Sequence, residues 1–268
     1  MRKKYIDFAV VILCPLFVFL SVFLLGLKPN YLESLLLFFG IPSLYLSIRS
    51  WSKTKKVGLF SFLISAPIAL IFILLIFGDN AWFVPKSVLQ NRLLGLVTLE
   101  DFVWMFLCTY VILIFYEHFF DKQFDKKTSS RVRNLLYALY GITFIFVTLF
   151  LITGSLLVIP YSYFLLCVLF WIIPISAFLI KYPEYIKNFA KVALFFFYLH
   201  LLFELMGLQM GYWVFSGAHY IGWISIFGFN IPLEEFLFVI LFGGLAPCVY
   251  YEYFTDRKLD IKHSSMLK

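Results

Sequence analysis

The stretch YLESLLLFFGIPSLYLSI, residues 31–48, reappears in outline as YFLLCVLFWIIPISAFLI, residues 163–180. Each stretch begins with a tyrosine, carries a proline 11 residues later and is otherwise largely apolar. An apolar run of about 20 residues is long enough to cross a bilayer as a helix. The pair therefore indicates two things at once: a membrane-spanning fold and an internal duplication.

The composition of the whole chain favours the same class. Of its 268 residues, 63% are hydrophobic and 22% aromatic, and the mean hydropathy is +0.94. A soluble domain averages roughly 45–50% apolar residues. We therefore predict an all-α polytopic membrane protein, whose first apolar run is too long for a signal-peptide core and is interpreted as a retained span. The eight runs that predict spans are 6–27, 31–48, 58–78, 100–118, 134–154, 157–180, 188–207 and 234–254.

The net charge of +7 has a topological explanation that does not involve nucleic acid. With eight spans and a cytoplasmic N-terminus, 19 of the 22 Lys and Arg residues fall on the cytoplasmic side. Only Lys28, Lys86 and Arg92 fall on the other side. Because positive residues concentrate in cytoplasmic loops, we predict an integral, multi-pass protein of the cell membrane with both termini cytoplasmic.

Further matches extend the duplication along the chain. LEDF (99–102) matches LEEF (233–236), and YEHFFDKQFD (116–125) matches YEYFTDRKLD (251–260), in the same order and at an offset near 132. The chain is predicted to consist of two four-helix halves, residues 1–130 and 131–268. An even number of helices gives both halves the same orientation, as parallel repeats related by an axis along the membrane normal.

Acidic residues in or beside these spans are candidates for function, because charge is costly in lipid. The outer candidates are Asp79, Glu100, Asp101, Glu204, Glu234 and Glu235. The inner ones are Glu117 and Glu252.

The acid pair in NIPLEEF (230–236) permits two interpretations. In the first, the carboxylates simply cap a helix that begins near Pro232. Alternatively, one of them faces the bundle, because neighbouring residues on a helix point about 100° apart. His200 and Glu204 are four residues apart and share a helix face, either as a satisfied interior pair or as a pair that handles protons.

The aromatic outer segments also leave an alternative open. Trp82, Trp213 and Trp223 could form an interfacial belt or line a channel for a hydrophobic ligand. The D-x-x-x-D patterns at 121–125 and 256–260 could hold Mg²⁺ for a diphosphate, but flanking Lys and Arg argue against it. No nucleotide-binding turn, zinc-protease motif or nucleophile elbow is visible, and no metal or cofactor is expected.

Nearly the whole chain resembles the membrane-integral lycopene cyclases, a bacterial, archaeal and fungal family of heterodimeric and fused enzymes with tandem cyclase domains. The family carries a P-x-E-E motif in each half, preceded by an aromatic stretch. PLEE at 232–235, after GYWVF at 211–215, matches it. The first half departs from the motif, since Thr98 replaces the proline and Asp101 the second glutamate.

The resemblance implies a lycopene β-cyclase, an isomerase that works as an intramolecular lyase without net redox change. An acid protonates a terminal double bond, the neighbouring double bond attacks the cation, and a base removes a ring proton. The implied catalytic candidates are Glu234, Glu235, Glu100, Asp101 and Glu204. The candidates for binding the polyene are Trp213, Tyr212, Trp82, Asp79 and His200.

Two other functions remain open at this stage. Intramembrane carboxylates in parallel repeats also suit a transporter, and the D-x-x-x-D pairs suit a Mg²⁺-dependent prenyltransferase. The pattern leaves open which glutamate gives the proton, whether one or both ends are cyclised, the ring type, the substrate's carbon count and the oligomeric state.

Overall fold

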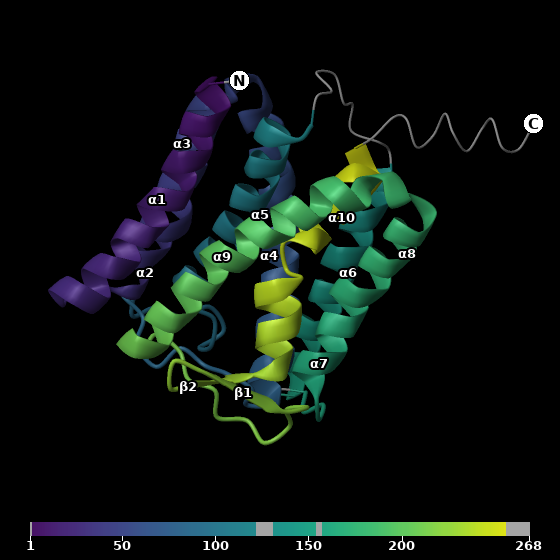
Figure 1. The fold of residues 1–268 in the computed structure, drawn as a ribbon. Coiled ribbons are helices and arrows are strands. Elements are labelled where there is room, and N and C mark those ends of the chain that lie inside the picture. Colours follow the sequence, from purple (N-terminus) through teal and green to yellow (C-terminus); the bar gives the residue numbers. More distant parts are fainter. Residues whose placement is uncertain (1, 122–130, 154–156, 256–268) are drawn as a thin grey trace, which may run out of the picture.

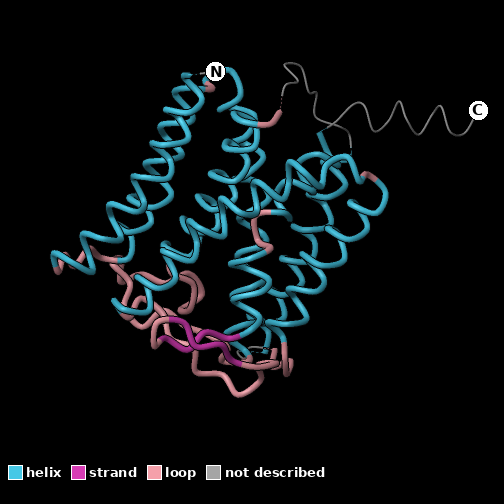
Figure 2. Tube along the Cα trace, viewed as in Figure 1, coloured by secondary structure: helices cyan, strands magenta, loops and turns pink. Residues whose placement is uncertain are grey.

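The computed structural model describes residues 2–121, 131–153 and 157–255, and nearly all of these residues are helical (Figures 1 and 2). Seven helical segments in the described residues are long and apolar enough to cross a membrane, and a bent pair of helices makes an eighth candidate. The only sheet in this part of the chain is a two-stranded hairpin. The protein is an all-α polytopic membrane protein, as the sequence predicts.

The first half contains four candidate spans. They are α1 (Arg2–Leu25), the interrupted helix of α2 (Tyr31–Leu35), η1 (Leu36–Gly40) and α3 (Ile41–Arg49), then α4 (Trp51–Gly78) and α5 (Leu99–Phe119).

The second half has the same order of elements. They are α6 (Arg131–Thr153), the interrupted helix of α7 (Ser162–Cys167), η2 (Val168–Ile172) and α8 (Ile173–Lys181), a short turn η3 (Pro183–Tyr185), α9 (Ile186–Met210), the strands β1 (Trp223–Ile226) and β2 (Phe229–Pro232), and the bent pair η4 (Glu235–Leu241) and α10 (Leu245–Thr255).

The two interrupted helices share an unusual break. In each, a five-residue π-helical segment precedes a proline: η1 before Pro42 and η2 before Pro174. Proline lacks the N–H for the helical ladder and clashes with the carbonyl four residues back, so the helix widens locally. In the second half the freed carbonyl, that of Phe170, accepts a hydrogen bond from the Tyr250 hydroxyl at 3.1 Å. A neighbouring helix thus satisfies the backbone group.

The predicted span 234–254 is not one straight helix. The π-helical segment η4 and α10 meet at an angle of 51°. Gly243 and Gly244 lie at the bend, where a side chain would collide with the Val239 carbonyl or with Phe196 on α9. Pro247 follows and cannot donate to the helical ladder. The glycines therefore let the broken span pack closely against α9.

The elements alternate between two ends of the bundle (Figure 1). Near the start of α1, Arg49 forms an ion pair with Asp7 (2.9 Å), and the Lys4 ammonium donates to the His118 carbonyl (3.1 Å). The starts of α1 and α4 and the ends of α3 and α5 therefore lie together at this end, where most of the basic residues gather. The hairpin β1–β2 and the long connections lie at the opposite end (Figure 2).

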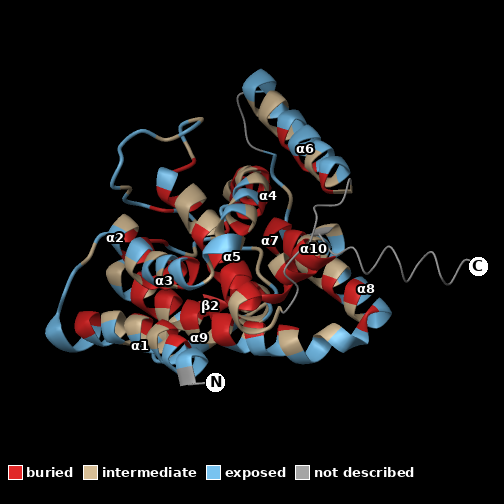
Figure 3. Cartoon of the chain, turned by 90° about the horizontal axis from the view of Figure 1, so that it is seen from above, coloured by how far each residue is buried: buried red, intermediate tan, exposed pale blue. Residues whose placement is uncertain are grey.

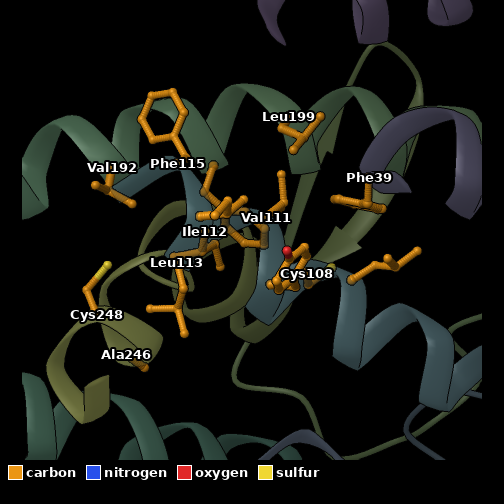
Figure 4. Close-up of a cluster of buried hydrophobic side chains, with 14 of the residues drawn as sticks. Phe39, Cys108, Val111, Ile112, Leu113, Phe115, Val192, Leu199, Ala246 and Cys248 are labelled. Atoms are coloured by element: carbon orange, nitrogen blue, oxygen red, sulfur yellow. The ribbon is translucent and has the colours of Figure 1, made fainter. Parts of the chain in front are cut away.

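The hydrophobic core lies where the two halves meet. Helix α5 passes through it, surrounded by residues of α9, α10 and the interrupted helix of the first half (Figure 4). The rings of Phe115 on α5 and Phe195 on α9 stack with centroids 3.8 Å apart. By contrast, α6 lies at the periphery with only 11% of its apolar window buried (Figure 3). Its exposed apolar surface suits contact with lipid.

A reciprocal pair of hydrogen bonds joins the halves near the end of the core where the basic residues gather. The Tyr116 hydroxyl of the first half donates to Glu252 of the second at 2.6 Å. The Tyr251 hydroxyl of the second half donates to Glu117 of the first at 2.5 Å. Lys53 also pairs with Glu117, at 2.6 Å. The repeated Tyr-Glu dipeptide thus contacts its own counterpart, which is the pattern that a two-fold axis produces.

Candidate active site

A cavity of about 110 Å³ lies between the two halves. Its walls come from α4, α5, α9, the bent pair η4–α10 and the interrupted helix of the second half. Most of the lining side chains are aliphatic or aromatic, and the Asp, Glu and His residues among them are Asp101, His200, Glu204 and Glu235. A mostly apolar pocket with a few convergent polar groups is the usual form of a small-molecule site.

Three of these side chains form one cluster. His200, Glu204 and Glu235 are all buried, and their ligand-type atoms lie within 4.8 Å of one another. His200 and Glu204 share a face of α9, as their spacing predicts. Glu204 accepts a hydrogen bond from the Trp213 indole at 3.0 Å, whereas Nδ1 of His200 has no partner within the described residues. The cluster therefore has unused hydrogen-bonding capacity facing the cavity.

The end of α9 explains how Trp213 reaches Glu204. Helix α9 ends at Gly211, which adopts the left-handed conformation (φ 66°) that favours glycine. The indole of Trp213 then folds back over Gly207, where any side chain would collide with the ring. Phe203 and Tyr31 hold the ring from two sides, with centroids 5.4 and 5.7 Å away. Gly207 is thus required for the Trp213–Glu204 hydrogen bond.

In both acid pairs, Glu100–Asp101 and Glu234–Glu235, the two carboxylates have different positions and partners. Glu234 accepts a hydrogen bond from the backbone N–H of Ile221 at 2.6 Å, and Glu100 accepts one from the N–H of Val88 at 2.6 Å. Both acceptors thus fasten the connection 12 or 13 residues before them. Neither Glu100 nor Glu234 lines the cavity, whereas the next residue in each half does. The first acid anchors a loop, and the second faces the cavity.

The second acids differ between the halves. Asp101 belongs to a capping box: its Oδ2 accepts from the Thr98 N–H at 2.9 Å, and the Thr98 hydroxyl accepts from the Asp101 N–H. Its Oδ1 is buried and has no partner in the described residues. The capping interpretation therefore applies to the first half. In the second half, Glu234 makes no capping bond to its own helix, and Glu235 points into the cavity cluster.

Two connections cover the cavity at the hairpin end. Phe83 and Val214 pair through two backbone hydrogen bonds of 3.1 and 3.2 Å. The tryptophans just before them, Trp82 and Trp213, both line the cavity, whereas Trp223 lies on β1 with 49% of its surface exposed. Of the two interpretations left open for these tryptophans, lining a channel fits the first two. Tyr220 also donates to the Ala81 carbonyl, and burial raises its pKa to about 12.

Two predicted binding residues lie away from the cavity wall. The Asp79 carboxylate is 2.6 Å from Nδ1 of His219 and 3.3 Å from the Ser162 N–H, so it joins the two halves at the hairpin end. The Tyr212 hydroxyl hydrogen-bonds Ser34 (2.7 Å) and the Pro29 carbonyl (2.5 Å). Burial raises the pKa of Tyr212. Both residues support the site from outside it.

Sequence reasoning did not single out the aromatic residues nearest the cluster. The rings of Phe196 and Trp104 lie 5.1 and 6.1 Å from the His200 ring, and Trp171 also lines the cavity. Helical spacing contained the signal, because Trp104 follows Asp101 by three residues and Phe196 precedes His200 by four. Searching one helical turn from Asp101 and from His200 would have found Trp104 and Phe196.

The donor set of the cluster is also one that a divalent metal ion can use. An imidazole and two carboxylates within 4.8 Å match the ligand types of zinc and other transition metals. For the D-x-x-x-D patterns, only Asp121 belongs to the described part of the chain, and Asp125, Asp256 and Asp260 lie outside it.

Comparisons of the chain with protein-family models, with curated protein sequences and with solved structures give no match. The functional argument therefore depends on the geometry and chemistry of the cavity.

Proposed function

We propose that this protein is a lycopene β-cyclase, which closes the linear end groups of lycopene into β rings by acid catalysis. The observation that carries the proposal is the buried cluster of Glu235, Glu204 and His200 in the wall of a long apolar cavity. The cavity suits a water-insoluble polyene that enters from the lipid bilayer. The cluster suits a reaction that needs one acid, one base and no redox cofactor.

The arrangement favours Glu235 as the general acid. Its side chain is buried and lines the cavity, whereas Glu234 does not line the cavity and its Oε1 accepts a hydrogen bond from the Ile221 backbone N–H. Two adjacent buried carboxylates cannot easily both be ionised, so a proton is retained in such a pair. Glu204, held by Trp213, is the second carboxylate of this pair.

The proton balance of the reaction closes within the cluster. Glu235 gives a proton to the terminal double bond, and the neighbouring double bond supplies the electron pair for the new ring bond. The resulting ring cation loses a proton to His200, whose buried Nδ1 has no partner among the described residues, or to Glu204. Return of that proton to Glu235 restores the site. The product is an isomer of the substrate.

Aromatic rings around the cluster support a cationic intermediate. Trp104 lies 6.1 Å from His200 and 6.5 Å from Trp82, centroid to centroid. Tryptophan presents the most favourable ring face to a cation, and desolvated contacts contribute about 2 kcal/mol or more. The same apolar walls exclude water, which would otherwise trap the cation as an alcohol.

Expression in bacteria that accumulate lycopene tests the proposal. Wild-type protein should convert lycopene to ring-containing products, seen as a red-to-orange change and identified by chromatography. Glu235→Gln should abolish the conversion. Glu234→Gln is the matched control, because the amide oxygen can still accept from Ile221, and it should keep most of the activity. Unchanged lycopene despite good membrane expression of the wild type would contradict the proposal and favour the transporter.

The proposal includes a location and an orientation. Most of the basic residues of the described chain gather at one end of the bundle, and the positive-inside rule makes that end cytoplasmic. Both termini would then lie in the cytoplasm, and the hairpin β1–β2 on the other side. Accessibility labelling of single cysteines placed at Lys86 and Lys53 checks this orientation.

A further inference from the structure

The buried cluster of His200, Glu204 and Glu235 has the geometry of a three-ligand zinc site. Each side chain offers one ligand atom, an imidazole nitrogen or a carboxylate oxygen, and the three atoms lie within 4.8 Å of one another. Ligands at about 2.1 Å from a tetrahedral zinc ion lie about 3.4 Å apart. Small rotations of the two glutamate side chains would therefore close the three atoms around one ion. Because all three residues line the cavity, the fourth position of the ion would face it.

The charges of the cluster match a divalent cation. Glu204 and Glu235 are 2% and 6% exposed, and the described residues that line the cavity include no Lys or Arg. Two buried carboxylates without a compensating charge are costly, so the pair holds a proton or binds a cation. Two carboxylates and a neutral imidazole around a divalent ion form a complex without net charge. Such a complex is compatible with apolar walls.

Two further contacts orient the ligands. The Trp213 indole N–H donates to Oε1 of Glu204 at 3.0 Å. The backbone of Val239 hydrogen-bonds the His200 ring, while Nδ1 of that ring has no partner among the described residues. One nitrogen of the imidazole is thus held in place, and the other has a lone pair to offer. Imidazoles and carboxylates that bind metal ions in proteins usually have such outer partners.

The donor set also selects among metal ions. Mg²⁺ demands near-octahedral coordination, and Ca²⁺ takes about six to eight oxygen ligands. The cluster supplies one nitrogen and two carboxylates in largely apolar surroundings. Zinc binds imidazole well and needs only three protein ligands and one water molecule. Zinc therefore fits this cluster better than Mg²⁺ or Ca²⁺ does.

The cluster is close to the hairpin end of the bundle. Glu235 follows the end of β2 by three residues, and Glu204 lies six residues, or about 9 Å, before the end of α9. The connections that pair at Phe83 and Val214 cover this end. An ion therefore has a short path from the surface of the bundle to the cluster.

We propose that the His200–Glu204–Glu235 cluster is a zinc-binding site, and that zinc inhibits the protein by occupying the groups that the reaction needs. The metal site stands on the geometry alone, whereas the inhibition rests on the proposed cyclase function. A Glu235 carboxylate that coordinates zinc has no proton to give. A Glu204 carboxylate or a His200 imidazole that coordinates zinc cannot accept one. Zinc and the transferred proton thus compete for the same atoms.

Cobalt absorption tests the site without any assay of activity. Co²⁺ accepts the same ligand types as Zn²⁺, and its visible absorption bands report four- or five-coordinate geometry. Purified full-length protein in detergent should show these bands with an equimolar amount of Co²⁺, and Zn²⁺ should abolish them. Glu204→Gln, Glu235→Gln and His200→Asn should each weaken zinc binding by at least about 100-fold, more than the loss of an outer partner costs. Glu234→Gln, at the neighbouring acid outside the cavity wall, is the matched control and should bind zinc like the wild type.

Trp213→Phe is a finer test, because it removes only the indole donor to Glu204. Its zinc affinity should fall by about 10–100-fold. The cobalt bands should remain, because all three ligands are still present. Trp223→Phe, at the half-exposed tryptophan of β1, is the matched control and should leave the affinity unchanged.

Inhibition is measured in membranes that convert lycopene. Saturating Zn²⁺ should lower ring formation by the wild type at least about 10²-fold, the lower limit for loss of a general acid, and EDTA should restore it. Absence of the cobalt bands, or unchanged zinc affinity in all three ligand variants, would overturn the site. Full ring formation by the zinc-loaded protein would overturn the inhibition. Cobalt bands in a wild type that converts no lycopene would support the metal site and contradict the proposed function.

Discussion

The two halves of this protein share the same order of helices but differ in the surroundings of their cavity-facing acids. Both contain an interrupted helix with a π-helical segment before a proline, and both place an acid pair at the start of their last span. In the first half that span is the straight helix α5, and its cavity-facing acid is engaged in a capping box. In the second half the span is bent by 51°, and its acid belongs to a buried cluster.

One residue accounts for much of this difference. From Asp101 to Tyr116 is 15 residues, whereas the equivalent interval from Glu235 to Tyr251 is 16. Both ends of the interval are fixed by contacts, so the extra residue must be absorbed between them. A π-helical turn accommodates such a residue, and π-helical turns are frequent at functional sites. The second half thus accommodates one more residue between its acid and its tyrosine through a π-helical segment, and the first half forms a regular helix over the shorter interval.

Exchanging each cavity-facing acid for its amide should give the largest difference in catalytic rate between the two halves. Glu235→Gln should reduce ring formation by at least about 10²–10⁴-fold, the usual contribution of a general acid. Asp101→Asn, which can still accept from the Thr98 N–H, should cost no more than about tenfold. Initial rates of lycopene conversion in membranes, normalised to protein amount, give both values. Equal losses would mean that the two halves share the chemistry.

A methyl group at Gly207 should lower the rate of ring formation while leaving the acidic residues of the second half unchanged. Gly207→Ala forces the Trp213 ring away from α9 and breaks its hydrogen bond to Glu204. Misplacement of a positioned group by about 1 Å can cost on the order of 10²-fold in rate. The measurement is the rate of ring formation. Gly141→Ala on α6, where a Cβ has open space, should change nothing. Full activity of Gly207→Ala would show that the hydrogen bond is dispensable.

The Tyr-Glu pairs should behave alike, because they are the part of the molecule where the halves match. Tyr116→Phe and Tyr251→Phe each remove one buried hydrogen bond between the halves. Each should lower the free energy of unfolding by about 1–3 kcal/mol, the cost of an unsatisfied buried group. Thermal unfolding in detergent measures the two losses. A large loss for one and none for the other would mean that the bonds are not equivalent.

Metal removal should have the smallest effect. If the His200–Glu204–Glu235 cluster works by proton transfer, dialysis against a chelator such as EDTA leaves ring formation unchanged. Metal analysis of the purified protein by mass spectrometry accompanies the assay. Loss of activity on chelation, restored by a divalent ion, would replace proton transfer by metal-assisted chemistry in the second half.

Much of the fold could be predicted from hydrophobicity alone, because a span must be apolar over a known length. The run 100–118 anticipates α5 within one residue at each end. The run 58–78 misses the first turns of α4, where Lys53, Lys55 and Lys56 belong to the helix but not to the apolar segment. The bend after Glu235 was not predicted, because a π-helical turn leaves no mark in hydropathy.

The site was predicted in part, and the limit has a physical reason. Spacing alone placed His200 and Glu204 on one face, since both belong to one regular helix. It could not separate Glu234 from Glu235, because that difference is made by the Ile221 N–H, 13 residues away across a hairpin. Nor could it place Asp79, whose partners His219 and Ser162 lie 140 and 83 residues away.

The reciprocal Tyr-Glu bonds have a consequence for the symmetry of the chain. Each half offers a tyrosine donor and a glutamate acceptor to the other, so two copies of a single half could satisfy the same contact twice. The contact is therefore symmetric although the cavity is not, because α9 presents His200 and Glu204 to the cavity and its counterpart α4 presents only aliphatic and aromatic side chains.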